Sequence, residues 1–381
     1  MPRLLFISLP LRGHLDWGGM MATAAHLAGQ PDFTVAWASG PAVAPALAAT
    51  DIAFLPLQAT GWQPLPPLPP RLSPAERERL RRQRSLDAWL DPAVVLPAAA
   101  ELRQLLAAWH PDLVLVEPYA VAAALAAEQA GTPLVVLGRP ALPPAAPTAA
   151  GMRAAALCQQ AGVAGQYWIL PLGQIASPWL HLDFFTREWY ADLPAVASPT
   201  QFVGSAPAPP RAPSTPPTIL ITLGTLFNQD PAFFRIAADA VRQEGGQPLV
   251  VTGHAAPPAS LPEGTEVRAW VDFAATLPII TGIIHHGGVG VTHAALRYGV
   301  PQVAVPHAGD QQPQAGRITQ AQVGYGVQPA QFTRTSARWF ARQLLHDDAL
   351  HARARAWQAE LAALGGPSVA TAAIRALLTR G

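Results

Sequence analysis

Residues 282–311 read GIIHHGGVGVTHAALRYGVPQVAVPHAGDQ, and this stretch indicates the fold class most directly. Its first four residues form a short apolar run, and glycines at 287, 288 and 290 follow. We expect a helix over about residues 291–298, after which Gly299, Val300 and Pro301 turn the chain into a second apolar run at 302–305. A strand, a helix and another strand in that order predict one unit of a doubly wound α/β sheet.

The glycines lie where the first predicted strand turns into the predicted helix. Glycine there lets backbone N–H groups approach an anion closely, and the helix dipole adds positive potential. The spacing matches neither the P-loop nor the dinucleotide-binding fingerprint, and the chain contains no lysine. The turn therefore predicts a diphosphate cradle that works without a lysine.

Apolar runs and alanine-rich helical stretches alternate in both halves of the chain. Runs that are apolar throughout suit parallel strands buried on both faces, so we expect two Rossmann-like, doubly wound domains. Proline, alanine and serine crowd residues 205–217, which predicts a stiff linker between a domain at 1–204 and a domain at 218–364, followed by a last helix at 365–381. The expected strands are 4–9, 34–38, 53–57, 113–117, 134–137, 218–223, 248–252, 266–271, 282–285 and 302–305. Helices are expected at 20–28, 119–129, 231–244 and 349–378, the last with a break at 365–367, and a further helix is expected to start at a Ser73 cap.

Composition excludes several classes of function. The 381 residues carry 25 basic and 24 acidic side chains, so the chain lacks the basic surplus of a nucleic-acid binder. The arginines at 77–84 are interleaved with acidic residues, which is typical of a solvated helix face. The single cysteine, Cys158, excludes an internal disulfide and a thiolate-rich zinc site. The apolar stretches at 4–10 and 113–127 read as neither a signal peptide nor a membrane span, so we expect a cytoplasmic protein without an integral membrane segment.

The pattern from Trp270 to Gln311 resembles the donor-binding signature of the family-1 nucleotide-sugar-dependent glycosyltransferases, which have the GT-B fold. That signature reads W-V, L-P, H-H-G-G-x-G, A-L, G-V-P, P and D-Q in order along the chain. The bacterial branch that glycosylates macrolides and other secondary metabolites is the most similar. I-T-L-G-T at 221–225 and P-L-R-G-H at 10–14 extend the resemblance over nearly the whole chain. It implies that the two domains face each other across a cleft and that the last helix crosses back to the first domain.

The resemblance implies that the second domain binds a UDP- or TDP-sugar. Trp270 would stack on the uracil or thymine ring, His286 and the glycine turn would hold the diphosphate, and Asp310 and Gln311 would bind the sugar hydroxyls. No metal or other cofactor would be required, because the helix terminus already supplies positive potential. The implied donor site comprises Thr222, Gly224, Thr225, Trp270, Val271, His286, Gly287, Gly288, Val289, Gly290, Val291, Asp310 and Gln311.

The resemblance also implies that the first domain binds a small, lipophilic acceptor. His14 would deprotonate the acceptor hydroxyl, and Glu117, at the end of a predicted strand, would orient His14. One direct displacement would then transfer the sugar with inversion. Asp16 and Trp17 stand beside the proposed base, where the usual family pattern differs, and are candidates for the acceptor pocket.

Each role has a plainer alternative. His14 is then an ordinary loop residue, Glu117 accepts a backbone N–H at a strand end, and Trp270 is a core residue. Val291 stands where the family usually has a hydroxyl residue. Ala294 stands where many UDP-dependent relatives have a ribose-binding glutamate, and this second difference favours a TDP donor. Two other functions remain open. One is a catalytically silent nucleotide-sugar-binding partner, which Val291 and Trp17 suggest, and the other is a nucleotide-sugar epimerase of the same fold, which would need a carboxylate pair near the sugar.

Overall fold

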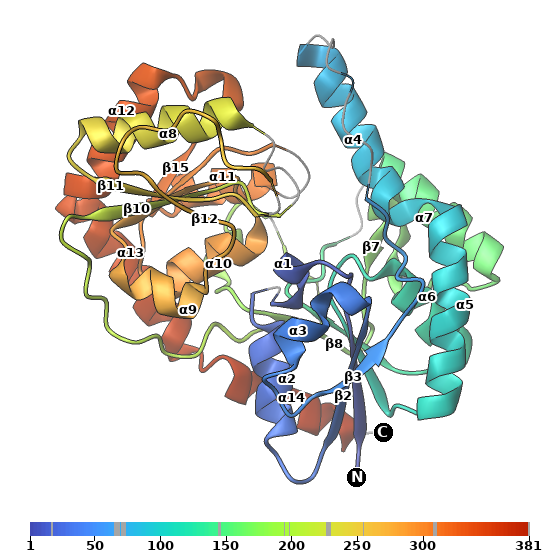
Figure 1. Cartoon of the computed structure of the whole chain (residues 1–381). Helices are drawn as coiled ribbons and strands as arrows, with labels where there is room; N and C mark the ends of the chain where they lie inside the picture. The colour runs from blue at the N-terminus through green and yellow to red at the C-terminus, as the bar shows by residue number, and fades with distance from the viewer. Residues whose placement is uncertain are drawn as a thin grey trace. The chain divides into compact units, whose positions relative to one another are not determined.

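The computed structural model describes residues 1–16, 18–64, 69, 74–143, 146–193, 195–197, 199–225, 230–253, 255–307 and 311–379. The chain folds into two compact units (Figure 1). Unit 1 comprises Met1–Phe184, Leu193–Val203 and Gly366–Gly381, and unit 2 comprises Phe185–Asp192 and Gly204–Gly365. This division differs from the predicted domain at 1–204, because Phe185–Asp192 packs within unit 2.

Unit 1 is built on a seven-stranded parallel sheet in the order β3-β2-β1-β4-β5-β8-β9. The five strands predicted for the first half are all present, with ends that differ by one or two residues. The sequence does not predict β8 and β9, because His181, Asp183 and Gln201 interrupt their apolar character. The strands are β1 (Arg3–Ile7), β2 (Thr34–Ser39), β3 (Ala53–Pro56), β4 (Leu113–Val116), β5 (Leu134–Leu137), β8 (Leu180–Asp183) and β9 (Thr200–Phe202), beside a small antiparallel pair, β6 (Trp168–Ile169) and β7 (Gln174–Ile175).

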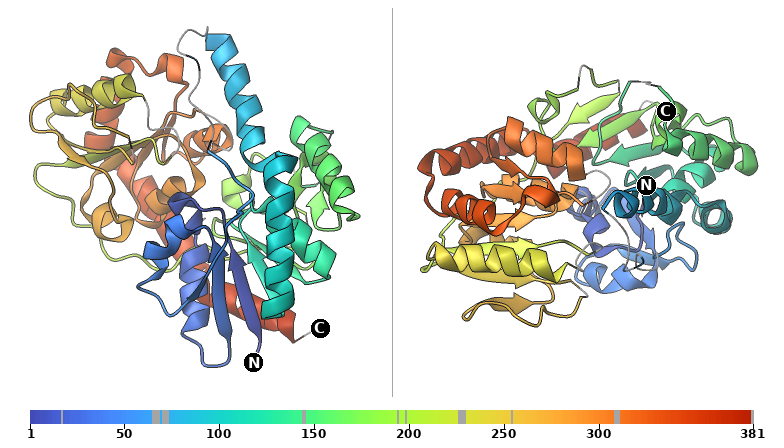
Figure 2. Two further views of the ribbon diagram at one scale, coloured as in Figure 1. Left: turned by 45° about the vertical axis from the view of Figure 1, so that its right-hand side comes forward. Right: turned by 90° about the horizontal axis from the view of Figure 1, so that it is seen from above.

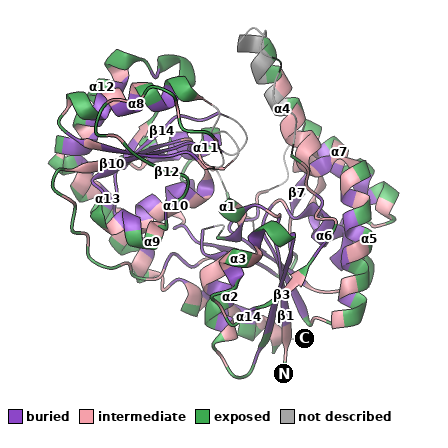
Figure 3. Ribbon diagram, in the orientation of Figure 1, coloured by how far each residue is buried: buried purple, intermediate pink, exposed green. Residues whose placement is uncertain are grey.

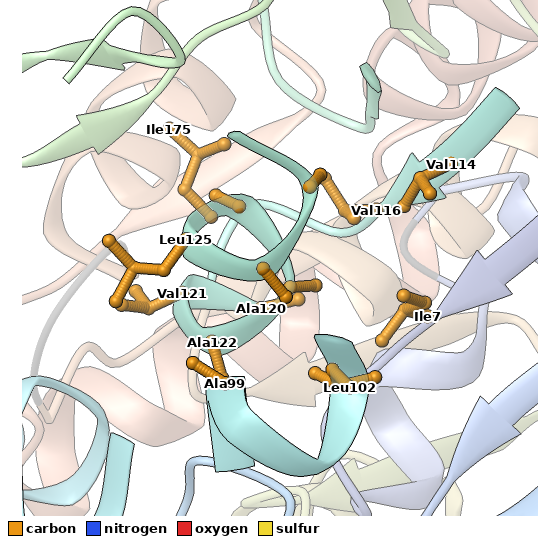
Figure 4. Close-up of a cluster of buried hydrophobic side chains, with 14 of the residues drawn as sticks. Ile7, Ala99, Leu102, Val114, Val116, Ala120, Val121, Ala122, Leu125 and Ile175 are labelled. Carbon is orange, nitrogen blue, oxygen red and sulfur yellow. The ribbon is translucent and has the colours of Figure 1, made fainter. Parts of the chain in front are cut away.

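Helices cover both faces of this sheet (Figures 1 and 2). Side chains of a strand alternate between faces, so Leu5 and Ile7 pack with α5 and α6, whereas Leu4 and Phe6 pack with α2 and α14. Figure 4 shows the first of these clusters, and Figure 3 shows the buried strands between the helices. The helices are α1 (Arg12–Leu15), α2 (Met20–Ala28), α3 (Ala44–Leu47), α4 (Pro74–Leu90), α5 (Pro92–Trp109), α6 (Val121–Ala130), α7 (Ala149–Ala161) and α14 (Pro367–Leu378). The predicted cap Ser73 lies outside the described residues.

Unit 2 is built on a six-stranded parallel sheet in the order β12-β11-β10-β13-β14-β15. The five predicted strands are present, and β15 is too short to be recognised in the sequence. Helices α8 and α12 pack on one face and α9 and α10 on the other. The strands are β10 (Thr218–Thr222), β11 (Gln247–Val251), β12 (Glu266–Arg268), β13 (Gly282–His285), β14 (Gln302–Ala304) and β15 (Gly324–Gly326). The helices are α8 (Pro231–Gln243), α9 (Phe273–Thr276), α10 (Val289–Arg297), α11 (Gln311–Gln320), α12 (Arg334–His346) and α13 (Asp348–Ala363).

The predicted linker, residues 205–217, belongs to unit 2 and is attached to the rest of that unit by hydrogen bonds. The backbone N–H groups of Ala212 and Ser214 donate to carbonyls of residues 278 and 279 at 2.9 and 2.8 Å. The Arg211 guanidinium donates to the carbonyl oxygens of Gly299 and Ile280 at 2.7 and 2.6 Å. These bonds hold the proline-rich segment in one extended path.

The stretch Asp348–Leu378 is long and apolar enough to cross a membrane, by length and composition. In the structure it is two helices, α13 in unit 2 and α14 in unit 1, separated at Gly365 and Gly366, which have φ angles of 90° and 58°. The apolar face of α14 packs against α2, so the stretch is broken into two short helices that each serve a core.

Candidate active site

The sheet of unit 1 changes its direction of growth between β1 and β4. From β1 the order continues to β2 and β3, and from β4 it continues to β5, β8 and β9 on the other side. In doubly wound sheets, ligands bind at the carboxyl ends of the strands at such a switch point. His14 lies on α1 shortly after β1, and Glu117 follows β4 directly. Because β1 and β4 are neighbours, both side chains reach this edge.

His14 and Glu117 are in direct contact. Nδ1 of His14 lies 3.1 Å from Oε1 of Glu117. The carboxylate is fully buried, and 16% of the His14 side chain is exposed. An ionised carboxylate can only accept, so this contact assigns the proton to Nδ1 and leaves the lone pair of Nε2 able to accept a proton.

Glu117 also accepts hydrogen bonds from the backbone. Leu9 N donates to Oε1 at 3.3 Å, and Tyr119 N donates to Oε2 at 2.8 Å. Both readings of Glu117 from the sequence are therefore present in one side chain. The two backbone bonds fix the carboxylate, which in turn fixes the orientation of the His14 ring.

The sequence does not predict Tyr119, which adjoins His14, or Trp89 and Arg139, which contact Tyr119. The ring centroid of Tyr119 lies 6.0 Å from that of His14, and Trp89 of α4 meets Tyr119 edge-on at 4.8 Å. The guanidinium of Arg139 lies 5.1 Å above the Tyr119 ring. No motif marks these residues, and the one signal in the sequence is that Tyr119 and Arg139 follow the ends of two predicted strands.

The chain beyond His14 is held by close packing. Asp16 is exposed and ends α1, while Trp17, the other acceptor-pocket candidate, lies outside the described residues. Gly18 has a φ of 77°, and a Cβ on Gly19 would collide with the ring of Phe184. Glycine is therefore required after the turn that carries His14.

The sheet of unit 2 has its own switch point, between β10 and β13. Gly224 follows β10, and His286, Gly287 and Gly288 follow β13. A Cβ on Gly224 would lie 2.6 Å from Cε1 of His286, and a Cβ on Gly288 would lie 2.5 Å from its Nε2. The imidazole thus lies against two glycines, which no larger residue can replace without displacing it.

The amino terminus of α10 opens at this turn. Its cap residue, Gly288, provides no side-chain hydrogen bond, so the first N–H groups of α10 are available to an anion. Burial, with smaller contributions from His285 and His307, lowers the pKa of His286 to about 3, so its ring is neutral at pH 7. Nδ1 of His286 is buried and has no hydrogen-bond partner among the described residues. The turn can therefore offer an anion both backbone N–H groups and a neutral imidazole.

Several other residues of the implied donor site hold the turns together. Oγ1 of Thr222 accepts from Gly224 N at 3.1 Å, and Oε1 of the buried Gln311 accepts from His307 N at 2.7 Å. His285 accepts from Gly287 N at 3.0 Å, which gives it the structural role expected of the histidine that precedes His286.

The remaining donor-site residues differ in exposure. Trp270 is 41% exposed just after β12, so its interpretation as a core residue is wrong. The side chains of Val271, Val289 and Val291 are buried, and only their backbone groups can meet a ligand. Thr225 and Gly290 are half-buried, and Asp310 lies outside the described residues. Among the residues that the structure describes, no group of three or more His, Cys, Asp or Glu side chains is placed to hold a metal ion.

Comparison with known proteins identifies relatives of the whole chain. Residues 247–377 match the model of the erythromycin biosynthesis protein CIII-like C-terminal domain, and residues 78–139 match the corresponding N-terminal domain. An L-demethylnoviosyl transferase of Streptomyces niveus is 31% identical over 353 residues, which cover 85% of each chain. A demethyllactenocin mycarosyltransferase of Streptomyces fradiae is 31% identical over 166 residues, which cover 43% of this chain and 36% of that protein.

Solved structures show the same fold. The glycosyltransferase of kitacinnamycin superimposes with a TM-score of 0.75 at 22% identity and covers 99% of this chain and 100% of its own. A spinosyn rhamnosyltransferase complexed with thymidine diphosphate superimposes with a TM-score of 0.71 at 22% identity, covering 98% of this chain and 99% of its own. Both unit folds therefore occur together in known glycosyltransferases.

Proposed function

Since the chain belongs to the erythromycin biosynthesis protein CIII-like glycosyltransferases of the GT-B fold, we propose that it transfers a hexose from a TDP- or UDP-sugar to a hydroxyl of a small, lipophilic acceptor, with inversion at the anomeric carbon. The observation that carries this proposal is the contact between His14 and the fully buried Glu117 at the switch point of unit 1.

His14 acts as the general base. With its proton held on Nδ1 by Glu117, the ring uses Nε2 to take the proton of the acceptor hydroxyl while the oxygen attacks the anomeric carbon. The carbon–oxygen bond to the diphosphate breaks as the new bond forms, so one displacement inverts the configuration. The Glu117 carboxylate continues to accept from Nδ1 and stabilises the imidazolium that results.

The diphosphate leaves from the turn of unit 2. The N–H groups at the start of α10 and the neutral ring of His286 stabilise the growing negative charge, and a phosphate oxygen gives the buried Nδ1 of His286 a partner. Trp270 carries the base of the nucleotide on its exposed face. We propose that no metal takes part, and activity in excess EDTA equal to that in magnesium or manganese would support this.

The acceptor lies beside His14. Tyr119 lies next to the base and Trp89 meets Tyr119 edge-on, so the pair offers apolar, flat surface, which supports a lipophilic and planar acceptor. One relative is named for the acceptor demethyllactenocin, and a spinosyn rhamnosyltransferase of the same fold has been solved with spinosyn aglycone, which supports a small-molecule acceptor here.

The decisive experiment is substitution of the base. His14→Ala is expected to lower the rate of sugar transfer about 100- to 10,000-fold, while binding of thymidine diphosphate measured by calorimetry is unchanged. His26→Ala, which removes an exposed histidine of α2 in the same unit, is the matched control and is expected to keep the rate of transfer. Transfer that survives His14→Ala, or a loss of nucleotide binding instead, would rule out this role for His14.

A further inference from the structure

The segment Phe185–Asp192, here called the clamp segment, separates from unit 1 just after β8 and packs within unit 2. Its three large aromatic residues, Phe185, Trp189 and Tyr190, are all buried. Phe185 and Trp189 stack on each other with ring centroids 5.1 Å apart. A short surface connection would bury no such set of side chains, so the segment has a specific partner within unit 2.

That partner is chiefly helix α11. Asp192 accepts two hydrogen bonds from the Arg317 guanidinium, at 2.8 and 3.0 Å, and the same guanidinium lies 4.5 Å above the ring of Tyr190. Trp189 Nε1 donates to Oε1 of the buried Gln314 at 2.9 Å. The buried hydrogen bond and the bidentate ion pair are both directional, so together they fix the position of α11 against the clamp segment.

The contacts fall on one stripe of α11. Gln311, Gln314 and Arg317 are spaced by three residues, so each is the neighbour of the next along one ridge of the helix surface. The first of them is the residue assigned to the sugar of the donor, and the other two are held by the clamp segment. A shift of α11 along its axis would move Gln311 by the same amount.

The clamp segment also reaches α10, whose amino terminus forms the diphosphate cradle. Phe185 meets the buried His293 of α10 edge-on, with ring centroids 5.3 Å apart. Trp189 meets Trp357 of α13 edge-on at 5.6 Å, which closes the packing from the other side. One short segment thus contacts both helices that carry the implied donor site.

We propose that the clamp segment positions the donor, with Asp192 and Trp189 fixing α11 for the sugar and Phe185 fixing α10 for the diphosphate. These are positioning residues, because they act through the helices that they hold. The inference rests on the proposed function, since it takes the donor to lie at the amino termini of α10 and α11.

Because Asp192 and Trp189 are assigned to the sugar and Phe185 to the diphosphate, their variants should differ in a way that a loss of stability alone would not produce. Asp192→Asn removes the ion pair at constant size, and Trp189→Phe removes the hydrogen bond but keeps an aromatic ring. Both are expected to raise the KM for the nucleotide sugar about three- to tenfold while the Kd for thymidine diphosphate, which lacks the sugar, stays the same. Phe185→Leu is expected to raise both the KM for the nucleotide sugar and the Kd for thymidine diphosphate. Asp192→Glu, which restores the charge, should recover part of the loss.

Glu244→Gln is the matched control, because the ion pairs of Glu244 among the described residues are with Arg338 and Arg342 of α12 in the same unit and not with α10 or α11. Melting temperatures without ligand are measured on every variant. If Asp192→Asn and Trp189→Phe leave the donor KM unchanged, or raise KM and Kd together only as far as Glu244→Gln does, the positioning role is wrong. Failure of the proposed function looks different, because the wild-type protein would then bind no nucleoside diphosphate, and Trp270→Ala would have no effect on binding.

Discussion

Replacement of Glu117 by glutamine gives the sharpest test of the catalytic pair. At the 3.1 Å separation and an effective dielectric constant of about 20, the attraction between the carboxylate and an imidazolium is about 5 kcal/mol. A neutral hydrogen bond is about half as strong as a charge-assisted one, so a glutamine that still accepts from His14 forfeits about 2.5 kcal/mol. Since about 1.4 kcal/mol of barrier corresponds to tenfold in rate, kcat is expected to fall about 100-fold.

The same substitution also lowers stability. The two oxygens of Glu117 accept from His14, Leu9 N and Tyr119 N, and a glutamine amide group must face a backbone donor at one of these positions. An unmatched buried donor costs about 1–3 kcal/mol, so the melting temperature is expected to fall as well. The rate must therefore be measured well below the melting transition, with the folded fraction followed by circular dichroism.

Glu101→Gln supplies the matched control. Glu101 accepts hydrogen bonds from the backbone N–H groups of Gln58 and Ala59 at 2.8 and 2.7 Å. Like Glu117 it holds backbone in place, but it is not part of the proposed site. It is expected to lose stability but to keep kcat and the Kd for thymidine diphosphate. If Glu117→Gln retains more than about a tenth of kcat, or loses rate only as Glu101→Gln does, Glu117 has no role in catalysis beyond holding the backbone.

Three further results are expected. Trp270→Ala should weaken binding of thymidine diphosphate by about 1–3 kcal/mol in calorimetry without lowering the melting temperature, whereas Trp339→Ala, which removes another exposed tryptophan of unit 2, should leave binding unchanged. Burial lowers the pKa of His285 to about 4 and that of His286 to about 3. As the pH falls below 6.5, the unfolded state therefore binds more protons than the folded state. Thermal melts should show stability declining from pH 6.5 toward 4. Ala294→Glu, which supplies a carboxylate on α10, should strengthen binding of uridine diphosphate relative to thymidine diphosphate, and equal gains for both would contradict the ribose-contact argument.

The features that the sequence predicts are those written locally. Continuous apolar runs mark the ten strands that were expected, and Asp230 before Pro231 marks the start of α8, where its carboxylate caps Ala232 and Phe233 at 3.1 Å. These two features depend on a few adjacent residues. The place of Glu117 beside His14 is implied by the family resemblance, and in the structure it follows from the pairing of β1 with β4.

The features that the sequence does not predict depend on packing between distant segments. Nothing in the spacing of the clamp segment shows that Trp189 will meet Gln314, 125 residues away. Tyr119 meets His14 through a ring contact and Arg139 meets Tyr119, and neither contact follows a motif. Such contacts depend on how helices settle on a sheet, and single-sequence patterns carry little information about this.

The two sheets share an order of strands but present different chemistry at their switch points. A general base must be a side chain, because a backbone group cannot take up a proton at neutral pH, and the switch point of unit 1 carries the side chains of His14 and Glu117. A diphosphate spreads its charge over several oxygens and is best met by several N–H groups at once, which requires the backbone itself to come close. Glycine at 224, 287 and 288 allows that approach, and any side chain there would displace the ring of His286 or the backbone of Gln311. In the proposed function, the acceptor half uses the side chains of His14 and Glu117, and the donor half uses backbone N–H groups that glycine leaves accessible.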